Sequence, residues 1–240
     1  VPGAGGAAGE RVWGEDYRDR VLPPAVIRLR NVTIRYGERV ILDSLNLTVR
    51  QGEHWALTGA NGSGKSTLLS LICADNPQAY AHDIELFGRP RGSGETIWDI
   101  KRQIGFVSPE LHRAFRMDAP ALDIVTSGHF DTEGLFRRPS AEQRDIALRW
   151  MEEFGIADLA ERPFLRLSSG EQRLCLVARA FVKDPPLYIL DEPLQGLDET
   201  QRRRVKVLLD KYCGAPGKTL LMVTHYPEEY PGCIDHSLSL

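Results

Sequence analysis

The chain has 240 residues, a length that suits one large domain or two small ones. Its 30 basic and 33 acidic residues give a formal net charge of −3, which excludes a globally basic nucleic-acid binder. Hydrophobic residues at 42% and charged residues at 26% are typical of a globular protein and exclude wholesale disorder. No apolar run approaches the roughly 20 residues that span a bilayer, so we expect a soluble chain.

The cysteines and the first residues indicate in which cellular compartment the protein is expected. Four cysteines lie far apart in the sequence: Cys73, Cys175, Cys213 and Cys233. Because they form no Cys-x-x-Cys pair, they predict neither a zinc site nor a redox motif, and they favour a reducing cytoplasm. The first residues show no charged segment followed by an apolar one, so we expect no secretory leader. The glycine-rich start predicts a flexible linker over residues 1–24, so we expect a cytoplasmic piece of a longer protein.

From residue 25 on, strand patterns alternate with helix patterns. Residues 25–32 alternate apolar and polar side chains, and residues 35–50 continue after a turn at Gly37, which predicts an antiparallel β unit. Further strands are predicted over residues 55–58, 187–190 and 220–224, and helices over residues 66–73, 171–182 and 201–212. This alternation indicates an α/β fold with a mostly parallel sheet. We expect residues 25–240 to form one domain, with a helical subdomain roughly over residues 110–165.

A glycine-rich segment between a predicted strand and a predicted helix fits the P-loop pattern G-x-x-x-x-G-K-[ST]. Its candidate phosphate-binding residues are Gly59, Asn61, Gly62, Ser63, Gly64, Lys65, Ser66 and Thr67. Triphosphate oxygens need converging backbone N–H donors, which glycine dihedrals allow, and the helix N-terminus adds positive potential. Lys65 is then predicted to contact the β- and γ-phosphates, and the Ser66 hydroxyl to bind Mg²⁺.

Two acids, Asp191 and Glu192, directly follow the predicted buried strand over residues 187–190. In open α/β sheets, ligands bind beyond the carboxyl ends of the strands. We therefore expect Asp191 to face the metal ion and Glu192 to face the γ-phosphate. At that place Glu192 could accept a proton from an attacking water, which is the task of a general base.

A P-loop also occurs in small-molecule kinases, GTPases and helicases, and the segment Leu-Ser-Ser-Gly-Glu-Gln-Arg at residues 167–173 discriminates among them. Ser168 followed by Glu171 is a capping box, which predicts a helix start. The same segment is similar to the Leu-Ser-Gly-Gly-Gln signature of the ATP-binding-cassette (ABC) ATPase family. The resemblance runs from about residue 26 to the end and includes six motifs in the family's order.

This resemblance implies the ABC type of P-loop fold, with ATP and Mg²⁺ as cofactors and hydrolysis of ATP to ADP and phosphate. It implies Lys65, Glu192 and His225 as catalytic residues, Ser66 and Asp191 as metal ligands, and Tyr36 as the aromatic residue that stacks on adenine. Ser168 and Gly170 match residues that close over the ATP of a second cassette, and Asp198 matches a loop that crosses the cassette interface. The implied partner is that second cassette, in tandem or as a homodimer.

Three positions depart from the family pattern. Ser169 stands where the family has its first signature glycine, and Glu171 replaces the signature glutamine. Pro109 stands where the family has a glutamine that helps to hold Mg²⁺ and links the nucleotide to a membrane partner. Glu110 is the neighbouring group that could substitute through its carboxylate. These departures bear on coupling to a partner more than on ATP binding.

Residues 86–101 and 107–112 are similar to the molybdate-transport/photorepair branch of the family, whose members are cytoplasmic tandem-cassette proteins. The first hypothesis is therefore a cassette that energises transport, in a molybdate-related role, through nucleotide-dependent cassette dimerisation. This hypothesis allows two further features: a membrane permease as a second partner, and a peripheral location at the inner face of the plasma membrane. The alternative is a non-transport ABC ATPase with a nucleic-acid or regulatory role, suggested by the missing glutamine and the basic run over residues 201–206. We expect no nucleic-acid partner, because that run fits a solvated helix face.

Overall fold

The computed structural model describes residues 23–240, so residues 1–22 of the predicted linker lie outside the described residues. The strands are β1 (Ala25–Tyr36), β2 (Arg39–Arg50), β3 (His54–Thr58), β4 (Asp83–Leu86), β5 (Arg89–Pro90), β6 (Ile104–Val107), β7 (Leu187–Asp191), β8 (Thr219–Val223) and β9 (His236–Ser239). The α-helices are α1 (Lys65–Ile72), α2 (Ile97–Lys101), α3 (Pro109–Ala114), α4 (Ala121–Thr126), α5 (Ala141–Glu153), α6 (Ser169–Phe181) and α7 (Glu199–Leu208). A π-helical turn, Leu209–Cys213, continues α7.

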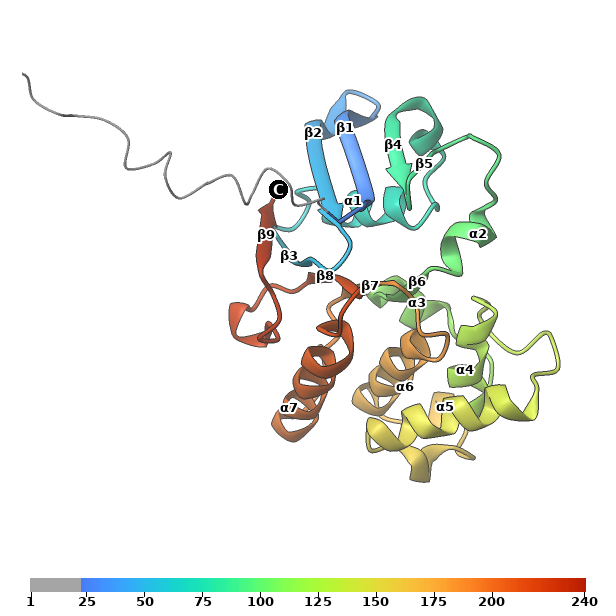
Figure 1. Ribbon diagram of the computed structural model, residues 1–240. Helices are drawn as coiled ribbons and strands as arrows, with labels where there is room; N and C mark the ends of the chain where they lie inside the picture. Colours follow the sequence, from blue (N-terminus) through green and yellow to red (C-terminus); the bar gives the residue numbers. More distant parts are fainter. Residues whose placement is uncertain (1–22) are drawn as a thin grey trace, which may run out of the picture.

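The strands form two sheets, with helices packed between and beside them (Figure 1). One sheet is antiparallel with the order β2-β1-β4-β5, and the other has the order β6-β7-β8-β3-β9. Every strand pair of the second sheet is parallel. The predicted α/β class, a parallel sheet with an N-terminal antiparallel β unit and a helical region, is confirmed. None of the helices within residues 23–240 is long and apolar enough to cross a membrane.

The parallel sheet separates two hydrophobic cores, because its central strands are buried on both faces. In β7, Leu187 and Ile189 belong to one core, whereas Tyr188 and Leu190 belong to the other. The first core includes α1, which lies between the two sheets (Figure 1). The second core contains residues of α4, α5, α6 and α7. The carboxyl ends of β3, β7 and β8 are thus held in place from both faces of the sheet.

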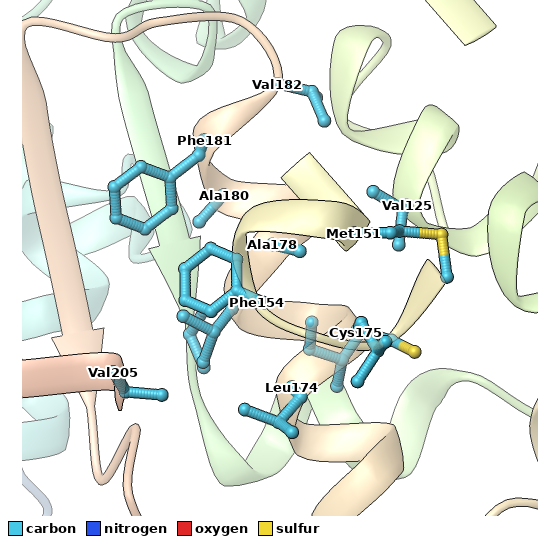
Figure 2. Close-up of a cluster of buried hydrophobic side chains, with 14 of the residues drawn as sticks. Val125, Met151, Phe154, Leu174, Cys175, Ala178, Ala180, Phe181, Val182 and Val205 are labelled. Atoms are coloured by element: carbon cyan, nitrogen blue, oxygen red, sulfur yellow. The ribbon is translucent and has the colours of Figure 1, made fainter. Parts of the chain in front are cut away.

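The second core is centred on α6, in which ten of the 13 residues are buried. Figure 2 shows Phe181 of α6 beside Phe154, which follows α5, with ring centroids 5.5 Å apart. Both side chains are at most 2% exposed, and aromatic pairs at such distances stabilise a core beyond their buried area. This packing fixes the direction of α6 and hence the place of its N-terminus, where residues 167–173 lie.

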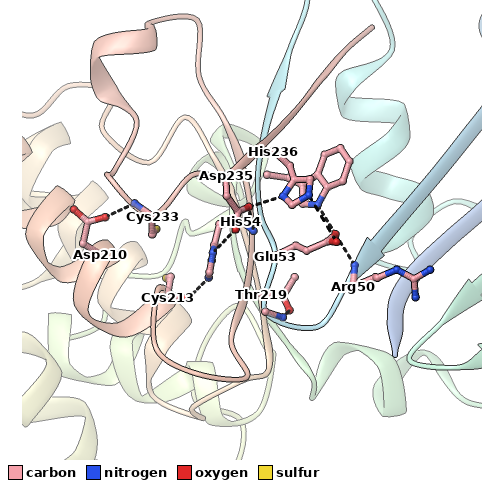
Figure 3. Close-up of polar contacts among 11 residues, drawn as sticks. Arg50, Glu53, His54, Asp210, Cys213, Thr219, Cys233, Asp235 and His236 are labelled. Atoms are coloured by element: carbon pink, nitrogen blue, oxygen red, sulfur yellow. Dashed lines mark hydrogen bonds and ion pairs between the residues drawn. The ribbon is translucent and has the colours of Figure 1, made fainter. Parts of the chain in front are cut away.

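The strand β9 lies beyond the last strand that the sequence predicted, over residues 220–224, and was not predicted. β9 pairs in parallel with β3, but as an exposed edge strand it has no apolar alternation that would reveal it. Polar contacts hold it instead: Figure 3 shows Asp235 between His54, whose Nδ1 is 3.4 Å away, and His236, whose Nδ1 is 2.6 Å away. The ring of Trp55 stacks on His236 at 4.8 Å. The strand β3 leads directly into the glycine-rich segment. The network of polar contacts between β3 and β9 therefore stabilises the strand from which that segment starts.

Candidate active site

The segment between β3 and α1 forms a tight loop at the carboxyl end of the parallel sheet. At Gly59, where φ is 144°, a Cβ atom would lie 2.6 Å from Ser63 Oγ and 2.7 Å from the Leu240 carbonyl oxygen. At Gly64, where φ is 103°, a Cβ atom would lie 2.7 Å from Leu42 Cδ2. Both positions therefore require glycine, and the loop packs closely against β2 and against the residue that follows β9.

Lys65 begins α1, and its side chain folds back over the loop. The ammonium group donates hydrogen bonds to the carbonyl oxygens of Gly59 and Ala60, at 2.6 and 2.9 Å. Ser66 is exposed in the same first turn. The ammonium and the positive end of α1 together concentrate positive potential at the loop, as an anionic phosphate chain requires.

The loop and the ends of β7 and β8 meet around one cleft of about 320 Å³. The cleft is lined by Arg39, Ile41, Asn61, Gly62, Gly64, Lys65, Ser66, Thr67, Pro109, Glu110, Asp191, Glu192, Val223 and His225. The structure thus brings together the predicted catalytic residues, the predicted metal ligands and most of the predicted phosphate-binding loop. Gly59 and Ser63 belong to the same loop but do not line the cleft.

Asp191 ends β7 at the floor of the cleft and is only 8% exposed. Within residues 23–240 its carboxylate has no hydrogen-bond donor. Burial, with the nearby charges of Glu110 and Glu192, raises the pKa of Asp191 to about 6, because desolvation and like charges both disfavour a carboxylate. A cation bound beside it would relieve both costs.

Glu192 is held in an unusual backbone conformation, with φ at 50°, a region that residues other than glycine rarely adopt. Its backbone N–H donates to the carbonyl oxygen of Val223 at 2.8 Å. His225 lies just beyond β8, and its Nε2 is 3.3 Å from Glu192 Oε1. Burial raises the pKa of Glu192, and the nearby His225 opposes the rise. The result is a mostly buried carboxylate whose Oε1 lies beside a histidine but has no hydrogen-bond partner within residues 23–240, an arrangement suited to accept a proton.

The residues of the cleft fit Mg²⁺. The Ser66 hydroxyl and the Asp191 carboxylate supply hard oxygen ligands, and Mg²⁺ in phosphate sites uses one or two carboxylates together with water and phosphate. Residues 23–240 contain no group of three or more His, Cys, Asp or Glu that could hold a metal ion. Glu110 lines the same cleft, where it pairs with Arg113 at 2.9 Å.

The remaining predicted site residues lie outside the cleft lining. Tyr36, 52% exposed, ends β1, and its hydroxyl accepts a hydrogen bond from Asn76 Nδ2 at 3.1 Å. Ser168 and Gly170 lie at the N-terminus of α6, and Asp198 lies at that of α7. A Cβ atom on Gly170 would lie 2.8 Å from the carbonyl oxygen of Gly196, so the chain just before α7 contacts the first turn of α6.

The predicted capping box at the start of α6 is confirmed. Ser168 Oγ accepts from the backbone N–H of Glu171 at 3.1 Å, and the Glu171 carboxylate accepts from the N–H of Ser168 at 2.8 Å. Glu171, which departs from the family's glutamine, therefore satisfies a backbone donor of its own helix. Ser169 is exposed, which explains why a side chain is accommodated where the family has glycine.

Three residues in or near the cleft were not among the predicted site residues: Arg39, Arg173 and Gln195. Arg39 follows the β1–β2 turn and donates to the Gly62 carbonyl oxygen at 3.5 Å. Arg173 of α6 donates to Gln195 Oε1 at 3.4 Å. The packing of β2 and α6 against the loops brings these residues to the site. Arg173 ends the motif segment over residues 167–173, but that pattern gave it no role.

The basic run over residues 201–206 makes contacts within the chain. Arg203 pairs with Glu199 at 2.9 Å, Arg202 donates to the Leu197 carbonyl oxygen at 3.0 Å, and Lys206 donates to the Glu228 carbonyl oxygen at 2.7 Å. The arrangement is typical of a solvated helix face.

The match to known proteins agrees with this site. Residues 42–195 match the family model described as ABC transporter. The chain belongs to the ABC transporter family. This membership confirms the predicted class, an ATP-binding cassette of the ABC ATPase type.

Individual relatives extend the likeness over most of the cassette. The ABC transporter ATP-binding protein ModF of Escherichia coli K12 is 46% identical over 88% of this chain and 44% of its own length. An uncharacterised ABC transporter ATP-binding protein of Schizosaccharomyces pombe is 35% identical over 88% of this chain and 43% of its own length. The chain therefore spans less than half the length of these two relatives. The dimeric post-hydrolysis structure of the cassette MJ0796, bound to ADP and Pi, is 28% identical, covers 89% of this chain and 94% of its own, and has a TM-score of 0.76.

Proposed function

We propose that the cleft binds ATP with Mg²⁺ and hydrolyses it to ADP and phosphate. The observation that carries the proposal is the convergence, in one cleft, of Lys65 with the Glu192–His225 pair, whose facing atoms are 3.3 Å apart. The loop N–H groups and Lys65 bind the phosphates. Tyr36, at the end of the neighbouring β1, stacks on the adenine. The MJ0796 structure with ADP and Pi supports this reading.

In this mechanism Glu192 accepts a proton from a water molecule as its oxygen attacks the γ-phosphorus. The bond from that phosphorus to the bridging oxygen breaks, and ADP leaves with the electron pair. Ser66 and Asp191 would hold Mg²⁺, which would supply positive charge to neutralise the β- and γ-phosphates. His225 orients the Glu192 carboxylate and contacts the γ-phosphate. Lys65 stabilises the charge that builds up on the phosphate oxygens.

The proposal includes a second cassette, in tandem or as a homodimer. Ser168, Gly170 and Asp198 lie outside the lining of their own cleft, which supports a role toward the partner's ATP. Residues 25–240 then act as one cassette domain, with a linker over residues 1–24. On the strength of the likeness to ModF, we propose a cytoplasmic protein that energises transport in a molybdate-related role, at the inner face of the plasma membrane where a permease is its partner.

A non-transport role, regulatory or on nucleic acid, is the second candidate, because Pro109 replaces the glutamine that couples the nucleotide to a membrane partner. Pro109 is the first residue of α3, and the neighbouring Glu110 pairs with Arg113. A DNA-binding titration at low and high salt separates the candidates, since phosphate contacts weaken steeply with salt. Binding that is absent at low salt removes the nucleic-acid version.

The test of the proposed function is Glu192→Gln, which keeps the shape of the side chain but removes its basicity. We expect ATP binding and ATP-dependent cassette association to persist while the hydrolysis rate falls about a hundredfold or more. The matched control is Glu199→Gln, which alters an exposed glutamate paired with Arg203 and should hydrolyse ATP at the parental rate. A Glu192→Gln chain that turns over ATP at the parental rate contradicts the assignment.

A further inference from the structure

Arg173 is a buried arginine without a full set of partners. It lies in the second turn of α6 and is 4% exposed. Its Nη2 donates to Gln195 Oε1 across a long 3.4 Å, whereas its Nε and Nη1 are buried and find no hydrogen-bond partner within residues 23–240. Because a buried cation is costly unless it is paired, this guanidinium needs compensating charge nearby.

The compensating charge comes from the cleft. Burial lowers the pKa of Arg173, and the carboxylates of Asp191, Glu192 and Glu110 oppose this by favouring the charged guanidinium. Its one hydrogen-bond partner, Gln195, belongs to the turn that follows the acids, since the Gln195 N–H donates to the Glu192 carbonyl oxygen at 3.2 Å. Arg173 therefore contacts the acidic turn from α6, the helix that begins with the signature residues.

Arg179, six residues further along the same helix, is a buried arginine that has the hydrogen-bond partners Arg173 lacks. It is 6% exposed, and it donates to Ser127 Oγ at 3.1 Å and to the Thr132 carbonyl oxygen at 2.9 Å. Its guanidinium also lies 5.3 Å from the centre of the Phe115 ring. Both arginines are buried on α6 and both have carboxylates nearby, which for Arg179 are Asp131 and Glu133. They differ in hydrogen bonding: Arg179 makes two hydrogen bonds away from the acidic turn, whereas the one hydrogen bond of Arg173 ends on that turn.

We propose that Arg173 is a positioning residue for ATP hydrolysis, holding the Glu192–Gln195 turn against α6 and balancing the charge of the three cleft carboxylates. The inference rests on the proposed function of the cleft. Arg173 does not line the cleft, so it acts through Glu192 and not on the nucleotide. Loss of the Arg173 side chain should therefore slow the chemical step and leave the affinity of the P-loop for ATP nearly unchanged.

The test compares Arg173→Met, Arg173→Lys and the matched control Arg179→Lys. We measure ATP affinity, KM and kcat, and follow folding by thermal unfolding. Arg173→Met should lower kcat about tenfold or more while KM and the ATP Kd stay within about threefold. Arg173→Lys, which keeps the charge, should recover most of the lost rate. Arg179→Lys should lower Tm and keep the parental kcat.

Gln195→Ala keeps the inference testable if Arg173→Met does not fold, because it removes only the hydrogen bond to Arg173. It should lower kcat about threefold without changing the ATP Kd. A parental kcat in Arg173→Met or in its substitute Gln195→Ala overturns the inference. So does an equal loss of affinity and rate, or an Arg173→Lys chain as slow as Arg173→Met. A parental chain that binds ATP without hydrolysing it overturns the proposed function instead, because the failure then precedes any substitution.

Discussion

The cleft and the start of α6 both contain carboxylate side chains, but the hydrogen-bond partners of these side chains differ. In the cleft, Asp191 is buried with no donor among residues 23–240, and Glu192 has a left-handed backbone. At the start of α6, Ser168 and Glu171 close a reciprocal pair of hydrogen bonds to backbone N–H groups. The cleft thus contains carboxylates without protein hydrogen-bond partners among the described residues, Glu192 Oε1 being buried as well, whereas the groups at the helix start are paired with each other.

This difference separates what each region does for the fold. Unsatisfied buried groups lower the stability of a protein, and active sites commonly keep them because binding needs them. A completed capping box raises stability. Substitutions in the cleft should therefore remove function and spare or raise stability, while substitutions at the cap should lower stability.

The largest expected effect is in the cleft, at Lys65. Lys65→Ala removes the ammonium that lies over the loop and should weaken ATP binding about a hundredfold, the range of a charged hydrogen bond. The fold should persist, because the lost hydrogen bonds end on Gly59 and Ala60 carbonyl oxygens. Equilibrium binding of a fluorescent ATP analogue measures the effect. Lys206→Ala, which alters a partly buried lysine on α7 outside the cleft lining, is the control. Tight ATP binding retained by Lys65→Ala would show that the loop is misinterpreted.

A smaller but more diagnostic effect is expected at Asp191. Its pKa is raised to about 6, above that of the unfolded chain, so the folded state loses stability as pH rises from about 4 to 6. Asp191→Asn removes this cost and should stabilise the ligand-free protein by about 1–3 kcal/mol at pH 8. The gain should shrink as pH falls through 6 and disappear near pH 4.

Thermal unfolding of the ligand-free parent and Asp191→Asn at pH 8, 6 and 4.5 measures this effect. Asp123→Asn is the matched control, because its carboxylate is already paired with Arg144 at 2.9 Å and should show no gain at pH 8. A lower Tm for Asp191→Asn at pH 8 would contradict the view that the cleft is strained without its ligand.

Most residues that line the cleft could be located from the sequence, because they sit in contiguous motifs at the ends of buried strands. The P-loop and the Asp191–Glu192 pair need only local spacing and a strand before them to be located. The helix start at Ser168 was equally accessible, since a capping box is a local hydrogen-bond pattern. Motifs of this kind can be recognised from neighbouring residues alone, without knowledge of the tertiary structure.

Tertiary packing decided what the sequence could not predict. The strand β9 has the polar sequence His-Ser-Leu-Ser, and its pairing depends on Asp235 and His54, which are far apart in the chain. Arg173 lies within a helix pattern that marks it as one charged residue among apolar neighbours. Its burial beside the cleft acids follows only from how α6 packs on β6 and β7.

The smallest effect is expected at the cap, where it separates stability from function. Ser168→Ala removes the hydrogen bond to the Glu171 N–H and should cost about 1 kcal/mol, lowering Tm by roughly 2–4 °C. Ser168→Asp restores a capping oxygen and should recover the Tm. Because Asp adds a negative charge where the partner's γ-phosphate is expected, it should still weaken ATP-driven association of the Glu192→Gln chain, measured by light scattering. If Ser168→Asp associates as well as the parent, Ser168 is only a helix cap.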